Sequence, residues 1–202
     1  MDEYPRGTIH IVQYIKDFYP QYWNKFETHP AEQCACVGKT KDEWGILSNF
    51  SKTPLIVNGV EFCCAEQLFQ MMQFQNKKIL KELHILTNQK LRMRAKRYMK
   101  EGFQRKDWGS FFIDAMKYSL MVKYQQSEEF RSELNRSKGL FIVDDQSIYH
   151  CKEANAWGTK LVDGNYTGSN LFGQLLTELR DNGKLEYNLP DDALNFIEHL
   201  KE

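Results

Sequence analysis

The chain has 202 residues, a length that suits one compact domain with a sizeable core. Lysine plus arginine and aspartate plus glutamate number 27 each, so the formal net charge is zero. A neutral chain has no general field that attracts DNA or RNA, and any contact with a phosphate must therefore be local. The sequence shows no apolar run near about 18 residues and starts without the basic and apolar regions of a signal peptide. We expect a cytoplasmic protein that makes no membrane contact.

Five cysteines, an odd number, argue against a disulfide framework in a chain of this length. Cys34 and Cys36, like the adjacent Cys63 and Cys64, lack the two-residue gap of zinc knuckles, and no histidine pair has the usual spacing. No metal site is expected. Cys63 and Cys64 are expected to end a half-buried strand, where cysteine behaves as a small hydrophobe.

The first expected element is a hairpin over 54–63, because Asn58-Gly59 between two β-branched runs favours a type I′ turn. Helical periodicity follows over much of the remaining chain. The expected helices cover 65–76, 77–86, 89–100, 108–125, 128–135 and 170–180, and the expected strands cover 139–143 and 147–151. The fold class is therefore α+β, mainly α-helical, with a small antiparallel β-sheet.

A polar stripe marks the first of these helices. Glu66, Gln70 and Gln73 fall at i, i+4 and i+7, on one helix face among apolar neighbours. A carboxylate and two amides are costly to bury without partners, so such a stripe is typical of a pocket wall. The alternative for Glu66 is that it only caps the helix.

Five short motifs occur in an order that resembles the NADAR (YbiA-like) superfamily, over about residues 44–180. They are Ser48-Asn49-Phe50 before the hairpin, Glu66 at a helix start, Trp108 at a later helix start, Asn155 ahead of Trp157-Gly158, and Gly168-x-Asn170-x-x-Gly173. The resemblance implies a single NADAR/YbiA-like domain over 41–183, an N-terminal extension over 1–40 and a tail over 184–202. In the tail, Leu194, Ile197 and Leu200 predict a docked amphipathic helix or, alternatively, a partner-binding helix.

The resemblance also implies an activity. Members of the superfamily are associated with hydrolysis of N-glycosidic bonds in a ribosylamino-pyrimidine intermediate of riboflavin synthesis or in ADP-ribosylated guanine, with no cofactor. The expected catalytic residues are Glu66, kept ionised by the helix dipole to support an oxocarbenium-like transition state, and Asn155 or Glu153, to orient the sugar or water. Trp108 and Trp157 are expected to clamp the base, although Trp108 could equally be core.

The substrate is anionic, so phosphate-binding residues are also needed. Asn170 lies at a helix start, where it is expected to act as an N-cap or to offer free N–H groups to a phosphate. Arg97 on the basic helix is a second candidate, with a solvated face as the alternative. The expected substrate-binding residues are Ser48, Asn49, Phe50, Gln70, Gln73, Arg97, Trp108, Trp157, Gly158 and Asn170. Glu66, both glutamines and both tryptophans are expected to surround one concave site.

Two positions depart from the family pattern. Gln73 stands where many members have a lysine linked to a Schiff-base step, and an amide cannot form one. Asn155 stands where the family has an acidic residue, and Lys123 is no obvious substitute for the missing amine. A catalytically altered sensor that binds ADP-ribose or a related nucleotide is therefore an alternative. The expected partner is a small-molecule nucleotide or ADP-ribosylated nucleic acid, and the termini could contact another protein.

Overall fold

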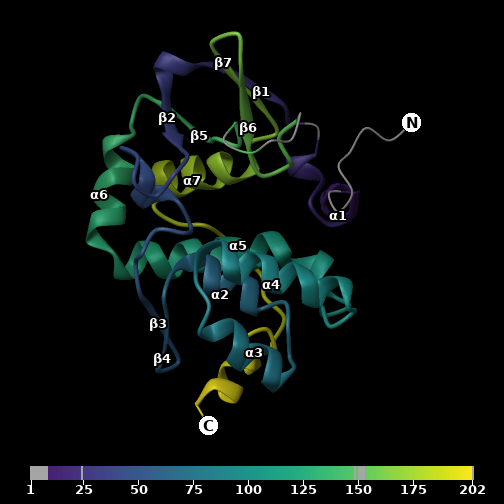
Figure 1. Cartoon of the computed structure of the whole chain (residues 1–202). Helices are drawn as coiled ribbons and strands as arrows, with labels where there is room; N and C mark the ends of the chain where they lie inside the picture. Colours follow the sequence, from purple (N-terminus) through teal and green to yellow (C-terminus); the bar gives the residue numbers. More distant parts are fainter. Residues whose placement is uncertain (1–8, 24, 148, 150–152, 202) are drawn as a thin grey trace. The chain divides into compact units, whose positions relative to one another are not determined.

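The computed structural model describes residues 9–23, 25–147, 149 and 153–201 (Figure 1). The chain forms two compact units, each assembled from segments that are distant in sequence. Unit 1 comprises Met1–Ser48 and Glu129–Leu185, and unit 2 comprises Asn49–Glu128 and Glu186–Glu202. Helices predominate and the strands are short, which confirms the expected mainly helical α+β class.

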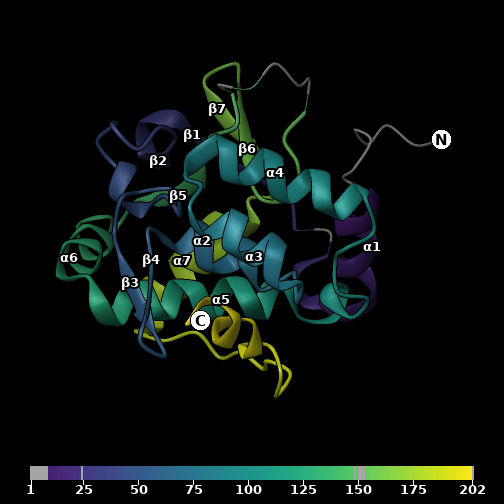
Figure 2. The ribbon, with the colours of Figure 1, turned by 60° about the horizontal axis from the view of Figure 1, so that its bottom comes forward.

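Unit 2 contains the predicted hairpin and four of the helices. In the hairpin, Val57 pairs with Val60, and Asn58 and Gly59 both have positive φ, as a type I′ turn requires. Figure 2 shows α2 beside α3 and α5. The elements are β3 (Leu55–Val57), β4 (Val60–Phe62), α2 (Ala65–Met71), α3 (Lys77–His84), α4 (Asn88–Lys100), α5 (Trp108–Gln126) and the 3₁₀ helix η4 (Asn195–Leu200).

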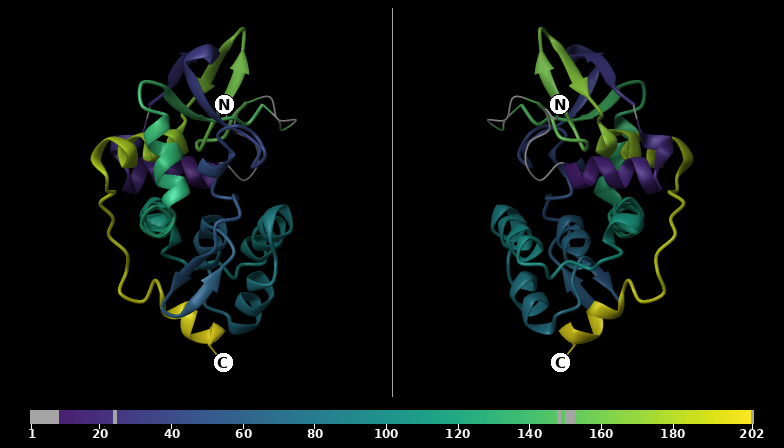
Figure 3. Two further views of the ribbon diagram at one scale, coloured as in Figure 1. Left: turned by 90° about the vertical axis from the view of Figure 1, so that its left-hand side faces the viewer. Right: turned by 90° about the vertical axis from the view of Figure 1, so that its right-hand side faces the viewer.

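The C-terminal segment completes the core of unit 2. Phe196 and Ile197 are buried, and the Phe196 ring meets Phe62 of β4 edge to face, with centroids 6.1 Å apart. Figure 3 shows η4 beside the hairpin. The segment docks as expected, but as a 3₁₀ helix. Its tighter winding buries Phe196 in place of the predicted Leu194 and Leu200, which stay half-exposed.

Unit 1 combines two small sheets with helices. One sheet is antiparallel with the order β1-β7-β6, as expected, and β2 and β5 add a parallel pair that the sequence did not indicate. Helix α7 packs on β5. The elements are α1 (Ile9–Phe18), η1 (Pro20–Tyr22), β1 (Glu27–Pro30), η2 (Ala31–Gln33), β2 (Cys34–Val37), η3 (Gly45–Leu47), α6 (Glu128–Arg136), β5 (Phe141–Asp144), β6 (Thr159–Val162), β7 (Asn165–Gly168) and α7 (Leu171–Asn182).

The predicted strand over 147–151 is not formed by its described residues, since Ser147 is in a turn and Tyr149 in a bend; its other residues lie outside the described part of the chain. The strands of this region are instead β6 and β7. Asp163 and Gly164 connect them, both with positive φ, in the same way that Asn58 and Gly59 connect the first hairpin. This Asp-Gly signal was available in the sequence.

The expected extension over 1–40 contributes β1 and β2, which pair with β7 and β5, so part of it belongs to the sheets of unit 1. Helix α7 extends two residues beyond the expected end at residue 180, and Gly183 caps it with φ of 68°. Among the residues that the structure describes, none of the helices combines the length and the apolar character needed to cross a bilayer.

Candidate functional site

A chain of side-chain amides in unit 2 ends on the carboxyl group of Glu66. Gln70 donates from Nε2 to Glu66 Oε1 at 2.9 Å, and Gln73 donates to Gln70 Oε1 at 2.7 Å. Gln104, from the loop before α5, donates to Gln73 Oε1 at 2.8 Å. Each amide thus donates toward Glu66, and the helical spacing of the polar stripe is what aligns them. The stripe was expected, whereas Gln104 was missed because the contact joins residues 31 positions apart.

Asn49 completes the surroundings of Glu66. Its backbone oxygen accepts from the Glu66 N–H at 3.0 Å, its side chain donates to the Glu66 carboxylate, and Nδ2 lies 2.8 Å from Met116 Sδ. The carboxamide oxygen of Asn49 is buried and has no hydrogen-bond partner among the described residues. An unpartnered buried acceptor is costly. It is therefore a place where a ligand hydroxyl or N–H would gain a hydrogen bond.

Burial raises the pKa of Glu66. The side chain is only 6% exposed, and this loss of hydration outweighs the opposing effects of the Arg92 charge and the hydrogen bonds from Gln70 and Asn49. The direction is opposite to the expected one, since the dipole of a helix as short as α2 does not offset the desolvation. A carboxyl of raised pKa can hold a proton closer to neutral pH and donate it.

Glu66→Gln is expected to raise the melting temperature increasingly as pH rises. A carboxyl whose pKa is higher in the folded state loses its favourable contribution as pH climbs from its unfolded value, about 4.3, through the folded one. The amide of the glutamine variant does not titrate, so its contribution to stability does not fall with pH. Thermal melts of both proteins from acid to mildly alkaline pH measure the difference. Glu61→Gln, at an exposed position on β4, is the control and should show no such trend. A difference that is constant with pH would contradict the raised pKa.

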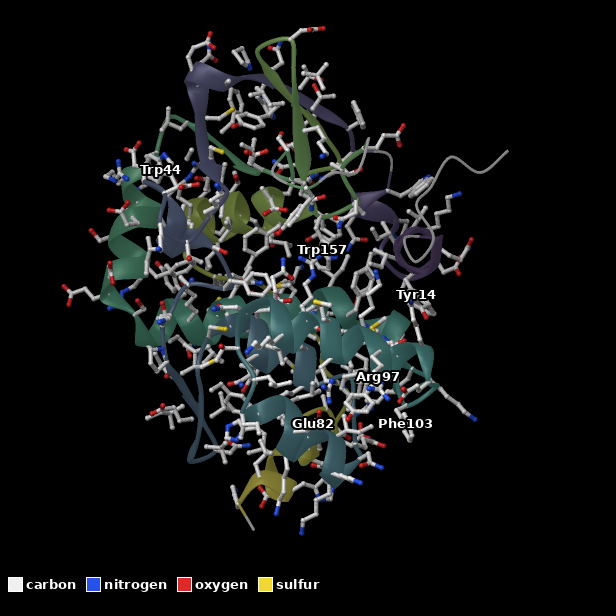
Figure 4. All side chains as sticks on the ribbon, viewed as in Figure 1. Tyr14, Trp44, Glu82, Arg97, Phe103 and Trp157 are labelled. Carbon is white, nitrogen blue, oxygen red and sulfur yellow. The ribbon has the colours of Figure 1, made fainter. Side chains whose placement is uncertain are left out.

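Arg92, and not Arg97, is the α4 residue whose charge acts on Glu66. The side chain of Arg97 is 65% exposed and pairs with Glu101 at 2.7 Å (Figure 4). Five residues at about 100° each place the two arginines on different faces of the helix, so only one can approach the carboxylate. The sequence showed the basic helix but could not show which face was turned inward.

The other residues that were predicted around the hairpin and on α5 differ in how far they are buried. Trp108 is buried, with its ring 5.4 Å from that of Phe69 and 5.1 Å from that of Phe111, as in the core alternative. Phe50 of unit 2 is half-exposed and Ser48 of unit 1 is buried. Lys123 of α5, which is fully buried, donates to Ser51 Oγ at 2.7 Å. The sequence placed Lys123 on a helix but did not indicate its burial.

Asn155 of unit 1 is held in a closed hydrogen-bond arrangement with Gln146. Its N–H donates to Gln146 Oε1, and its Oδ1 accepts from Gln146 Nε2, both at 2.9 Å. The same Oδ1 accepts from the Trp157 N–H at 2.9 Å, and Gln146 Nε2 also donates to Asp144 Oδ2 at 3.0 Å. Asn155 therefore fixes the loop that carries Trp157. Glu153, the alternative catalytic candidate, is exposed.

Close backbone approaches explain the glycines of the motifs. A Cβ at Gly158 would lie 2.6 Å from the Asp144 backbone oxygen. A Cβ at Gly173 would lie 2.2 Å from the Ile142 oxygen and 2.5 Å from the Asn170 side chain. Both contacts are shorter than real Cβ atoms make, so each glycine is a packing requirement.

Asn170 does not cap α7 with its side chain. It has φ of 49° and makes no side-chain cap hydrogen bond. Its Nδ2 instead donates to Glu27 Oε2 and to the Ile142 oxygen, both at 2.8 Å, and its Oδ1 accepts from the Asp144 N–H at 3.1 Å. The predicted cap is wrong because the side chain joins β1 and β5 to the start of α7. A role in phosphate binding stays a prediction.

Trp157 is half-buried in the loop just before β6 (Figure 4), and its backbone oxygen accepts from the Phe172 N–H of α7 at 2.9 Å. The expectation that it shares one concave site with Glu66 involves residues of both units and stays a prediction. In the described part of the chain, no group of histidine, cysteine, aspartate and glutamate side chains has the arrangement of a metal site.

Asn155→Asp is expected to keep the stability of the wild type, whereas Asn155→Leu should lose about 1–3 kcal/mol. The aspartate retains an oxygen for Gln146 Nε2 and the Trp157 N–H, while leucine leaves the buried Gln146 donor without that acceptor. Urea denaturation of the three proteins provides the comparison. Equal stabilities for the two variants would show that these hydrogen bonds do not hold the loop.

Comparisons with known proteins agree with this architecture. The model of the NADAR domain matches residues 36–182. N-glycosidase YbiA of Shigella boydii is 29% identical over 147 residues, which cover 73% of this chain and 86% of that protein; the protein of the same name from Escherichia coli K12 has the same identity and coverage. The NMR structure of E. coli YbiA is similar with a TM-score of 0.58 and 27% identity, covering 79% of this chain and 91% of that one. Since the family model spans well over half of the sequence, the chain belongs to the NADAR domain family.

Proposed function

We propose that the protein is an N-glycosidase, which hydrolyses the bond between C1 of a ribose and a nitrogen of a base. The observation that carries the proposal is the pair formed by Glu66 and Asn49. A buried carboxyl of raised pKa lies beside a buried carboxamide oxygen that has no hydrogen-bond partner in the part of the chain that the structure describes. The first can supply a proton and the second can accept one hydrogen bond from a sugar hydroxyl or a water. The YbiA relatives, which are N-glycosidases by name, support the same class.

In the proposed reaction, the protonated carboxyl of Glu66 donates to the departing nitrogen as the C1–N bond breaks and its electron pair moves to that nitrogen. The resulting carboxylate stabilises the positive charge on the sugar. A water oxygen then bonds to C1, and its proton returns to Glu66. Gln70 holds Oε1 throughout, because its own position is fixed by Gln73 and Gln104.

The proposed substrates are the phosphorylated ribosylamino-pyrimidine intermediate and ADP-ribosylated guanine. Both offer a ribose whose hydroxyls can donate to Asn49 Oδ1 and a base nitrogen that needs a proton on departure. Arg92 adds a positive charge near Glu66, which suits an anionic substrate in a chain without net charge.

One observation favours a second candidate function, a module that binds ADP-ribose without cleaving it. Gln73, which replaces the amine common in the family, has its amide engaged on both sides, by Gln70 and by Gln104. This arrangement is well suited to hold a ligand and lacks a nucleophile at that position.

Chromatographic detection of released base from each substrate distinguishes the two functions. The glycosidase proposal expects release from at least one of them with simple kinetics at catalytic protein concentrations. Tight binding of ADP-ribose, without release from either substrate after long incubation, would support the binding module and overturn the glycosidase.

A further inference from the structure

A small pocket in unit 1 is built largely by residues that precede the family match. Tyr22, Trp23, Lys25 and Phe26 line it together with Ala154 and Ala156, and its volume is about 280 Å³. That is close to the lower end of ligand-binding pockets, about 300 Å³, so the space fits one base-sized fragment. The two alanines flank Asn155, whose hydrogen bonds with Gln146 hold this wall in place.

Three aromatic side chains from one short segment, Tyr22, Trp23 and Phe26, line the pocket. Phe26 is 69% exposed, which is unusual for a phenylalanine. A ligand that covered the ring would explain this exposure. Tyr22 is oriented by a hydrogen bond from its hydroxyl to Glu178 at 3.2 Å. Lys16 lies over the Trp23 ring, 4.2 Å from its centroid. Aromatic faces of this kind stack on any flat π-system without hydrogen-bond demands.

The charged side chain in the wall of this pocket favours a negatively charged ligand. Lys25 is the only charged residue among the described lining, and its Nζ lies 5.6 Å from the centroid of the Tyr22 ring. A larger neighbouring pocket, about 620 Å³, shares Tyr22 and Lys25 but also has the carboxylates of Glu27 and Glu178 in its wall, where the cation of Arg180 is paired with Asp181 at 2.7 Å. Those carboxylates repel an anion, so the smaller pocket is the better match for a negatively charged aromatic ligand.

We propose that the pocket formed by Tyr22, Trp23, Lys25 and Phe26 binds a nucleotide, with the base stacked on the aromatic side chains and the phosphate near Lys25. This segment lies before residue 36, where the family match starts, while Ala154 and Ala156 on the other wall lie within it. The inference stands apart from the chemistry at Glu66 and requires no hydrolysis.

Isothermal titration with adenosine 5′-monophosphate, adenosine and inorganic phosphate tests the site on the full chain. Phe26→Ala should weaken binding of both the nucleotide and adenosine by roughly tenfold or more, because both lose the stacking face. Lys25→Gln should weaken the nucleotide alone, by about threefold, and should reduce the salt dependence of its binding. Inorganic phosphate alone should bind far more weakly than the nucleotide.

Matched controls come from the same unit. Phe18→Ala removes an aromatic ring that is 51% exposed and outside the pocket, and Lys41→Gln removes an exposed charge elsewhere. Both should leave the affinities unchanged. Absence of nucleotide binding, or equal losses for Phe26→Ala and Phe18→Ala, would overturn the inference.

The result is independent of the proposed glycosidase. If Phe26→Ala weakens nucleotide binding while the wild type releases no base from either substrate, the pocket is confirmed and the glycosidase proposal fails. If hydrolysis depends on Glu66 while Phe26→Ala and Lys25→Gln bind like the wild type, the glycosidase proposal survives and the pocket fails.

Discussion

Glu66→Gln is expected to lower kcat/KM for N-glycosidic hydrolysis by roughly 10²–10³-fold, which corresponds to about 3–4 kcal/mol of transition-state stabilisation. The amide keeps the shape of the side chain and can still accept from Gln70 Nε2, but it can neither donate a carboxyl proton nor carry negative charge. Initial rates of base release under matched conditions measure the effect, with binding of ADP-ribose as a check that the site remains formed.

One control and one companion variant separate the chemistry from general effects of the substitution. Glu61→Gln removes the same charge from an exposed position of the adjacent hairpin and should leave the rate unchanged. Asn49→Ala removes the buried oxygen proposed to accept from the substrate and also the donor to the Glu66 carboxylate, so it should raise KM and lower kcat together. A Glu66→Gln protein with the rate of the wild type would remove Glu66 from the mechanism.

The parts of the fold that local rules govern could be predicted from the sequence. Asn58-Gly59 specified a hairpin because few residues tolerate two successive positive φ angles, and Gly183 marked the end of α7 for a similar reason. Helical spacing aligned Glu66 with Gln70 and Gln73. Each of these signals spans fewer than about ten residues, within which backbone geometry alone fixes the outcome.

What the sequence could not give depends on contacts between distant segments. Gln104 joins the amide chain from 31 residues beyond Gln73, and nothing in its local pattern marks it. Desolvation, which reverses the expected pKa direction of Glu66, is a property of the assembled core. Asn170 matched a capping pattern but bonds to Glu27, a partner 143 residues away. Local propensity was outweighed there by a buried hydrogen-bond network.

Gln73→Lys is expected to change the reaction and to destabilise the protein by about 1–3 kcal/mol. Gln73 is buried, donates to Gln70 and accepts from Gln104; an ammonium group has three donors and no acceptor, so Gln104 Nε2 would lose its partner and meet a positive charge. That charge would favour the ionised form of the Glu66 carboxyl and so lower the pKa of Glu66 from its raised value.

Two kinetic outcomes follow under the glycosidase proposal. A general acid is active while protonated, so a lower pKa of Glu66 should move the alkaline decline of kcat/KM to lower pH. The introduced amine should also raise or redirect activity, because it can attack C1 of the opened ribose, expel water and form a Schiff base. Borohydride reduction followed by mass spectrometry would detect that bond as an adduct at position 73.

Gln75→Lys is the matched control. It adds the same charge two residues further along the chain, at an exposed position. The Gln75 amide of the wild type donates to Asp192 at 3.0 Å, and a lysine at position 75 can pair with the same carboxylate. It should show neither the pH shift nor the adduct. If neither the wild type nor Gln73→Lys hydrolyses either substrate, and the substitution alters only the affinity for ADP-ribose without an adduct, the site binds without catalysis. The engaged amide of Gln73 would then be part of a binding site that holds its ligand intact.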